Sequence, residues 1–124
     1  MITGIGTDIV QLSRIASALA RRGDSLARRL LADSEWQRYQ THSDPVRFLG
    51  KRFAAKEAAL KALGTGLRQG IRWHDVAVTN DGNGKPSLTF SGVAGKIMVA
   101  NRCHLSISDE QDYALAFVII ESES

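Results

Sequence analysis

Residues 43–66 read SDPVRFLGKRFAAKEAALKALGTG, and this stretch carries the clearest secondary-structure signals in the chain. Ser43 or Asp44 can accept hydrogen bonds from the first free amides of a helix, and Pro45 suits the first helical position. Gly64 suits the residue just past a helix end, where a left-handed backbone is common. The stretch therefore predicts a central helix between these start and stop signals.

This helix, expected over residues 46–63, carries one apolar stripe along its length. The stripe consists of Leu49, Phe53, Leu60 and Leu63. Glu57 falls at the edge of the stripe, so we expect its carboxylate to be half buried. Lys61 follows one turn later, and the two residues are also typical of a surface ion pair between positions i and i+4.

The first strand is expected over residues 2–10, which are rich in β-branched side chains. Alternation places Gly4, Gly6 and Asp8 on one face and Ile5, Thr7 and Ile9 on the other. Because the glycine face lacks bulk beside Asp8, another backbone or a ligand can approach that carboxylate closely.

Shorter elements fill the rest of the chain. Ser13, Ser25 and Ser34 are suitable N-caps for three short helices before the central one, the first of which ends near Gly23. After the central helix, the turn residues 80–84 separate two expected strands, 73–79 and 86–91, which predicts a hairpin.

The chain closes with a helix and two strands. The helix carries Val93, Ile97 and Met98 on its inner side, and the strands are expected over 104–108 and 113–120. Strands and helices are mixed without a strict β-α-β rhythm. We therefore expect an α+β fold, in which residues 1–124 form one compact domain with a mainly antiparallel sheet around the central helix.

The composition is that of an ordinary folded protein, because 44% of the 124 residues are apolar and 23% are charged. The single cysteine, Cys103, excludes an internal disulfide and a cysteine cluster for zinc; it is expected to be a buried small side chain in a reducing compartment. The longest purely apolar run, 113–120, is far shorter than the roughly 20 residues that span a bilayer. Since the first residues also lack the pattern of a secretion signal, we expect a cytoplasmic protein with no membrane partner.

Positive charge is concentrated near the front of the chain, within a net charge of +3 and a pI near 9.4. Arg14 and Arg21 share one side of the first expected helix, an arrangement that suits an acidic docking partner. A nucleic-acid-binding module is the alternative that this charge allows. No zinc pattern, helix-turn-helix pattern or strand of mixed basic and aromatic residues supports that alternative, so we expect no nucleic-acid partner.

Asp8, Glu57 and the segment from Lys61 to Gly66 can cooperate in one site. Two carboxylates with phosphate oxygens make a suitable environment for Mg²⁺. Lys61 can neutralise phosphate charge, and the backbone amides of Gly64, Thr65 and Gly66 can cradle phosphate oxygens even though a helix C-terminus disfavours anions. The two carboxylates alone would also permit a small Mg²⁺-dependent phosphohydrolase.

His104 begins one of the last strands and shares a face with two serines, Ser106 and Ser108. The pattern is that of a histidine on a polar surface. If His104 faces the carboxylate site, it can donate a hydrogen bond to a phosphate or move a proton near neutral pH.

Three motifs in this chain resemble those of the bacterial holo-acyl-carrier-protein synthases. They are GIGTDIV at residues 4–10, RFAAKEAALKALGTG at residues 52–66, and HLSIS at residues 104–108 followed by Tyr113 and Ala114. The resemblance covers essentially the whole chain in order, and the first two motifs are long and specific.

The resemblance implies an α+β protomer that assembles into a homotrimer with active sites between neighbouring subunits. It implies that Asp8 and Glu57 bind Mg²⁺, and that Lys61 and His104 lie near the phosphates of coenzyme A. Arg14 and Arg21 match arginines that meet an acidic helix of acyl carrier protein. Many members have a second histidine near the position of Asp109 in this chain.

The implied reaction transfers 4'-phosphopantetheine from coenzyme A to a serine of apo-acyl carrier protein, in fatty acid biosynthesis. The serine hydroxyl attacks the phosphorus nearest pantetheine, and adenosine 3',5'-bisphosphate leaves. Mg²⁺ and Lys61 would stabilise the charge that develops on the pyrophosphate. Glu57, a water on the metal and His104 remain open as acceptors of the serine proton.

Overall fold

A computed structural model describes residues 1–123 of the chain. Its helices and strands follow the chain in the order β1 (Ile2–Gln11), α1 (Leu12–Arg22), α2 (Asp24–Leu30), α3 (Asp33–Gln40), α4 (Pro45–Leu63), the 3₁₀ turn η1 (Trp73–Asp75), β2 (Val76–Asn80), β3 (Pro86–Phe90), α5 (Gly92–Ile97), β4 (Asn101–Asp109) and β5 (Tyr113–Ser122). One antiparallel sheet has the strand order β1-β5-β4, and β2 pairs with β3 in a separate hairpin. The α+β fold with antiparallel sheets is therefore confirmed.

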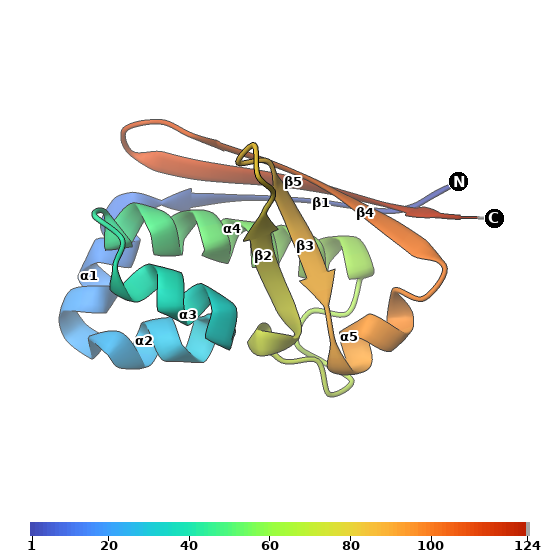
Figure 1. Cartoon of the computed structure of the whole chain (residues 1–124), viewed down its shortest axis with the longest axis horizontal. Coiled ribbons are helices and arrows are strands. Elements are labelled where there is room, and N and C mark those ends of the chain that lie inside the picture. The colour runs from blue at the N-terminus through green and yellow to red at the C-terminus, as the bar shows by residue number, and fades with distance from the viewer. Residues whose placement is uncertain (124) are drawn as a thin grey trace.

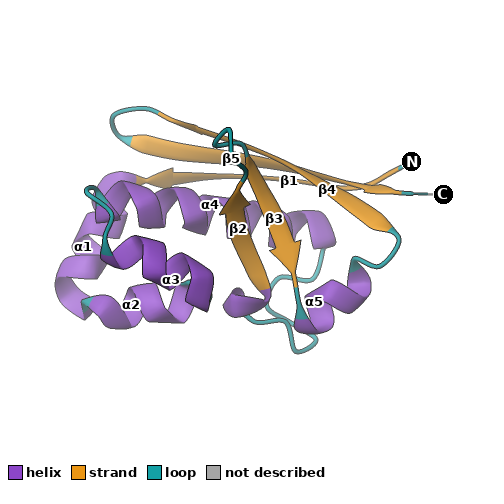
Figure 2. Cartoon of the chain, viewed as in Figure 1, coloured by secondary structure: helices purple, strands orange, loops and turns teal. Residues whose placement is uncertain are grey.

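The helix α4 lies along one face of the three-stranded sheet, and α1, α2 and α3 gather near one end of it (Figure 1). The hairpin β2-β3 crosses α4 on a second side, where β2 contacts α4 and β3 contacts β4 of the sheet (Figure 2). Because it is covered on both sides, α4 buries more than the one stripe that its sequence predicts. Leu49 and Leu60 are buried as expected, and the alanines between them, Ala54, Ala55, Ala58 and Ala59, are buried as well.

The start and stop signals of α4 are confirmed. The Asp44 carboxylate accepts a hydrogen bond from the Arg47 amide at 3.1 Å, and Pro45 is the first helical residue. Gly64 ends the helix with φ of 79°, a left-handed conformation that glycine adopts without strain.

The glycine face of β1 packs directly against the backbone of α4. A Cβ atom on Gly4 would clash with the Ala62 carbonyl oxygen, and one on Gly6 would clash with the Ala58 carbonyl oxygen. The predicted close approach beside Asp8 is therefore made by a helix of the same chain. Glycine is required at both positions because any larger residue would push the strand away from the helix.

The three short helices exist, but their predicted caps are wrong. Helix α1 begins at Leu12, directly after β1, so Ser13 lies inside it. Helices α2 and α3 begin at Asp24 and Asp33, so Ser25 and Ser34 also lie within their first turns. The Ala32 amide at the start of α3 is satisfied instead by the Glu35 carboxylate, at 2.9 Å.

The second half of the chain differs from expectation at two places. The hairpin is confirmed, but Trp73 begins a 3₁₀ turn and strand β2 starts only at Val76. In α5, Ala94 is the fully buried residue, whereas Ile97, expected on the inner side, is exposed. Because α5 spans only six residues, it is too short for an apolar periodicity to define its inner face.

The outer face of the three-stranded sheet carries exposed apolar side chains. Ile5 and Ile9 of β1 are 57% and 63% exposed, and Leu115 and Phe117 of β5 are 41% and 40% exposed. In the described part of the chain, all helices lie on the other side of this sheet (Figure 2). No helix among residues 1–123 is both long and apolar enough to cross a membrane.

Candidate active site

The fold brings Asp8, Glu57 and Lys61 together at the C-terminal end of α4. Lys61 Nζ lies 3.1 Å from Asp8 Oδ1 and also donates a hydrogen bond to the Thr7 carbonyl at 3.0 Å. The short ion pair of Lys61 is therefore made with β1, and not with Glu57 as the sequence pattern suggested. The contact follows from the close approach of β1 to α4 at the two glycines.

Glu57 lies beside this ion pair and is half buried, as predicted. Burial raises the pKa of Glu57 above its usual range, and the negative charge of Asp8 raises it further, while Lys61 acts in the opposite direction. The negative charges of Asp8 and Glu57 thus repel each other, and the positive charge of Lys61 offsets this repulsion only in part. A divalent cation would relieve this repulsion.

A hollow of about 470 Å³ opens at these residues. Glu57, Lys61, Gly64, Gly66 and Trp73 are among the residues that line it. Gly66 has φ of 59°, which favours glycine, and a Cβ atom on it would meet no described atom within 4 Å.

One part of the expected phosphate cradle is wrong. The Gly64 amide already donates to the carbonyls of Leu60 and Lys61, as is usual just past a helix end. The Gly64 amide is therefore not free for a phosphate. A phosphate cradle at this loop remains a prediction for the amides of Thr65 and Gly66.

The donor set fits Mg²⁺ bound together with a phosphate ligand. Among residues 1–123, no three histidine, cysteine, aspartate or glutamate side chains are grouped so that protein alone would hold a metal. Mg²⁺ usually takes only one or two protein carboxylates and completes its coordination with water and substrate phosphates. Asp8 and Glu57 would supply those two carboxylates: Glu57 lines the hollow, and Asp8 contacts Lys61, which also lines it.

His104 does not join these residues within one chain. It lies on the outer face of the sheet, where the register pairs it with Ile119 of β5, whereas Asp8 faces α4 on the inner side. Its Nε2 atom lies 2.8 Å from Glu121 Oε1, and this hydrogen bond lowers the pKa of Glu121. The sheet therefore separates His104 from the carboxylates of its own chain.

The remaining residues singled out by the sequence lie elsewhere on the surface. Arg14 and Arg21 are exposed on α1. Cys103 is half buried, and burial raises its pKa to about 11, so its thiol is unreactive near neutral pH.

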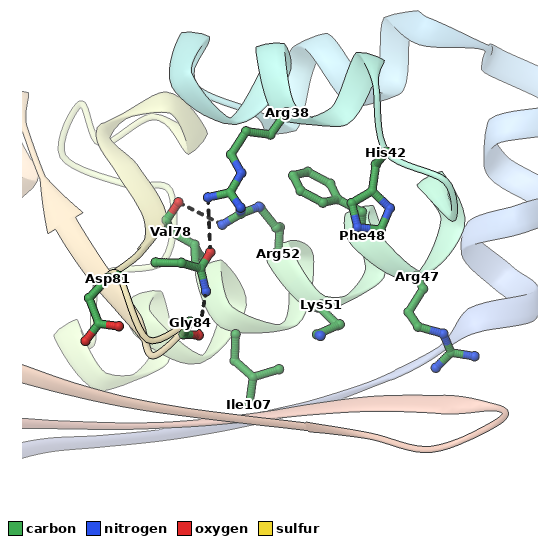
Figure 3. A pocket seen from close by; sticks show the side chains of 12 residues that line it. Arg38, His42, Arg47, Phe48, Lys51, Arg52, Val78, Asp81, Gly84 and Ile107 are labelled. Carbon is green, nitrogen blue, oxygen red and sulfur yellow. Dashed lines mark hydrogen bonds between the residues drawn. The ribbon is translucent and has the colours of Figure 1, made fainter.

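A second hollow, also of about 470 Å³, lies at the other end of α4 and was missed by the sequence reasoning (Figure 3). Its cationic lining residues are Arg38, Arg47, Lys51 and Arg52. Asp109 partly neutralises them, because it accepts a hydrogen bond from Arg47 at 2.8 Å and lies 3.6 Å from Lys51. The spacing of Arg47 and Lys51, one helical turn apart, was the available signal.

Comparison with known proteins gives a consistent answer. The model of the 4'-phosphopantetheinyl transferase superfamily matches residues 4–118. The holo-[acyl-carrier-protein] synthase of Erwinia tasmaniensis is 53% identical over 125 residues, covering 98% of this chain and 98% of the relative.

Solved structures agree with this result. The holo-[acyl-carrier-protein] synthase from Neisseria meningitidis superposes with a TM-score of 0.93 at 41% identity, covering 98% of this chain and 100% of that chain. A synthase from Bacillus anthracis, solved in complex with CoA (3',5'-ADP), has a TM-score of 0.83 at 39% identity and covers 98% of each chain. Since the family match and these relatives span nearly the whole sequence, this chain belongs to the holo-acyl-carrier-protein synthases of the 4'-phosphopantetheinyl transferase superfamily.

Proposed function

We propose that this protein transfers the 4'-phosphopantetheine group of coenzyme A to a serine of apo-acyl carrier protein in a Mg²⁺-dependent reaction. The observation that carries the proposal is the convergence of Asp8, Glu57 and Lys61 at a hollow bordered by Gly64 and Gly66. The products are holo-acyl carrier protein and adenosine 3',5'-bisphosphate, and the pathway served is fatty acid biosynthesis. The names of the relatives and the coenzyme in the Bacillus anthracis complex support this reaction.

Asp8 and Glu57 would hold the Mg²⁺. When bound, the ion supplies positive charge that stabilises the pyrophosphate as its bridging bond breaks. Lys61 is half exposed at the rim of the hollow, so its ammonium can exchange part of its contact with Asp8 for a phosphate oxygen. Lys61 would thereby bind and orient the coenzyme.

The groups considered as proton acceptors occupy different places. Glu57 lines the hollow, whereas His104 of the same chain lies across the sheet. Within one chain, the acceptors that remain open are thus Glu57 and a water on the proposed metal. His104 would take part in proton transfer or phosphate binding only from a neighbouring copy.

A homotrimer with sites between subunits would bring the two groups of residues together. The proposal is supported by the exposed apolar side chains on the outer sheet face, which also carries His104. Burial of such a patch against a second copy is favourable, because it removes apolar surface from water. Mass measurement of the native assembly tests the stoichiometry.

The acyl carrier protein is proposed to dock on α1 through Arg14 and Arg21. Both guanidinium groups are exposed and can pair with an acidic helix. Replacing both by glutamate should raise KM for the carrier protein at least about tenfold with little change in KM for coenzyme A. A cytoplasmic location is proposed with this reaction, since coenzyme A is its donor and the one cysteine is a free thiol.

The decisive experiment is intact-mass analysis of an apo-acyl carrier protein incubated with this protein, coenzyme A and Mg²⁺, with and without EDTA. The expected result is a gain of one phosphopantetheine that EDTA prevents. An unchanged carrier mass with several carriers would contradict the proposal. Hydrolysis of coenzyme A without any carrier protein would favour the phosphohydrolase alternative.

A further inference from the structure

A second charged cluster is sealed inside the protein, away from the residues proposed to bind coenzyme A. The side chains of Glu35 in α3 and Lys56 in α4 are both 0% exposed, and Lys56 Nζ lies 2.6 Å from Glu35 Oε1. Arg52, one turn earlier in α4, lies 3.7 Å from Glu35 Oε2. Burying charged groups costs free energy even when they are paired, and a buried ion pair often adds little net stability. A function of this cluster is therefore expected in its contacts with the backbone.

The side chains of this cluster form hydrogen bonds with the backbone of β2 and of the turn before it. Lys56 donates hydrogen bonds to the carbonyls of Trp73, at 3.1 Å, and of Val76. Glu35 accepts a hydrogen bond from the Val78 amide at 3.1 Å, and Arg52 donates to the Val78 carbonyl at 2.7 Å. These side chains form hydrogen bonds with backbone groups on the edge of β2 that does not pair with β3. Without them, a further strand would be needed to pair these buried backbone groups.

The same contacts lead directly to the active-site hollow. Lys56 immediately precedes Glu57 in α4, and the carbonyl that it holds belongs to Trp73. The Trp73 ring lies 5.6 Å from the ring of Phe53 and lines the hollow together with Glu57. One buried ammonium thus joins two walls of the hollow, the helix with Glu57 and the turn with Trp73.

We propose that Glu35 and Lys56 are positioning residues for phosphopantetheinyl transfer, which fix the Trp73 wall of the hollow relative to Glu57. The inference rests on the proposed function for its role in the reaction. Glu35 balances the charge of Lys56, and Lys56 holds the turn at Trp73. Neither residue lines the hollow, so both act on the coenzyme only through this geometry.

Loss of the pair should therefore weaken coenzyme binding more than the chemical step. Lys56→Met keeps the length of the side chain and removes its hydrogen bonds to the turn. We expect KM and Kd for coenzyme A to rise about tenfold, with kcat changed less than about twofold. Coenzyme binding is measured by titration without carrier protein, so this readout does not need the transfer reaction.

Trp73 itself provides a second readout, because the chain contains only two tryptophans. In a Trp36→Phe background, Trp73 is the only indole. Lys56→Met should then shift its emission to the red as the turn loosens and water reaches the ring. The same shift in Glu35→Gln would assign the effect to the pair.

A variant that lowers stability elsewhere serves as the matched control. Leu12 is buried in α1 and packs against Gly50, at the far end of α4 from the hollow. Leu12→Ala should lower the melting temperature and leave the Kd for coenzyme A and the Trp73 emission unchanged. All variants are compared at a temperature where each is fully folded.

The double variant Glu35→Gln/Lys56→Met covers the case in which a single variant fails to fold, because it leaves no unpaired charge of this pair. It should fold and still bind coenzyme A about tenfold more weakly. Wild-type affinity and emission in the folded variants would overturn the inference and leave the pair a purely structural one. Absence of transfer by the wild-type protein, with normal coenzyme binding, would instead contradict the proposed function.

Discussion

Lys61 Nζ lies 3.1 Å from Asp8 Oδ1, although the two residues are 53 positions apart in the chain. The contact crosses from α4 to β1, and it is possible because Gly4 and Gly6 let the strand lie against the helix backbone. Glu57, one turn before Lys61, is near the carboxylate of Asp8, and Lys61 compensates the negative charge of the two carboxylates only in part. A divalent cation at this position, as proposed above, would compensate the charge of both carboxylates.

Glu57→Gln should abolish Mg²⁺-dependent transfer while the fold stays intact. The amide keeps the shape of the side chain and removes one of the two proposed anionic ligands, so we expect kcat/KM to fall at least about 100-fold. The measurement is the initial rate of mass gain on the carrier protein, with circular dichroism as the check of folding. Wild-type activity in this variant would remove Glu57 from the site.

The same variant should be more stable than the wild type at neutral pH in the absence of metal. Because the folded-state pKa of Glu57 is raised, the folded protein binds its proton more tightly than the unfolded chain does. Any stability from this group is therefore present at low pH and is lost as the pH rises through the raised pKa. Adding Mg²⁺ should raise the melting temperature of the wild type and not that of Glu57→Gln, which thermal scans at two pH values can test.

Gly6→Ala should destabilise the protein by about 3 kcal/mol, because the new Cβ atom would clash with the Ala58 carbonyl in a rigid helix. Urea unfolding measures the change. Gly82→Ala is the matched control, since a Cβ atom at Gly82 would meet no described atom within 4 Å and its φ is not positive. Equal stability of the two variants would show that β1 moves away from α4 without cost.

Asp109→Asn should remove a part of the stability that the protein has at neutral pH and loses in acid. The Arg47 hydrogen bond, together with the charges of Lys51 and Arg47, lowers the pKa of Asp109 although partial burial opposes this shift. Its stabilisation is present above the ordinary aspartate pKa and is lost as the pH falls through the lowered pKa. Urea midpoints of variant and wild type should therefore differ at neutral pH and converge in acid. A constant difference at every pH would contradict this account.

Phe117→Glu should prevent self-association without unfolding the chain. Phe117 is exposed on the outer sheet face, and a buried unpaired carboxylate at a subunit contact would be costly. Light scattering should find monomers of the variant, and transfer activity should fall because His104 of a neighbour is no longer supplied. Gln37→Glu, at an exposed position of α3, is the control for the added charge. A monomeric wild type would overturn the assembly proposal.

Local signals in the sequence predicted much of the fold. The caps at Asp44 and Gly64 defined α4, and alternation in β1 placed Gly4, Gly6 and Asp8 on one face, because both features depend on residues a few positions apart. The predicted serine caps were wrong because α2 and α3 begin at Asp24 and Asp33, which makes Ser25 and Ser34 the second helical residues. The candidate residues Asp8, Glu57 and Lys61 came from the chemistry of their side chains, and their roles remain predictions.

The sequence by itself determined the central helix, the glycine face of the first strand and the motifs of the family. Only the tertiary structure decided that Lys61 pairs with Asp8, that Glu35 is sealed against Lys56, and that His104 lies across the sheet from both carboxylates. These relationships depend on the strand order β1-β5-β4 and on how closely the layers approach. Such contacts join residues distant in the chain, and their energies arise from packing and burial, which a local pattern does not contain.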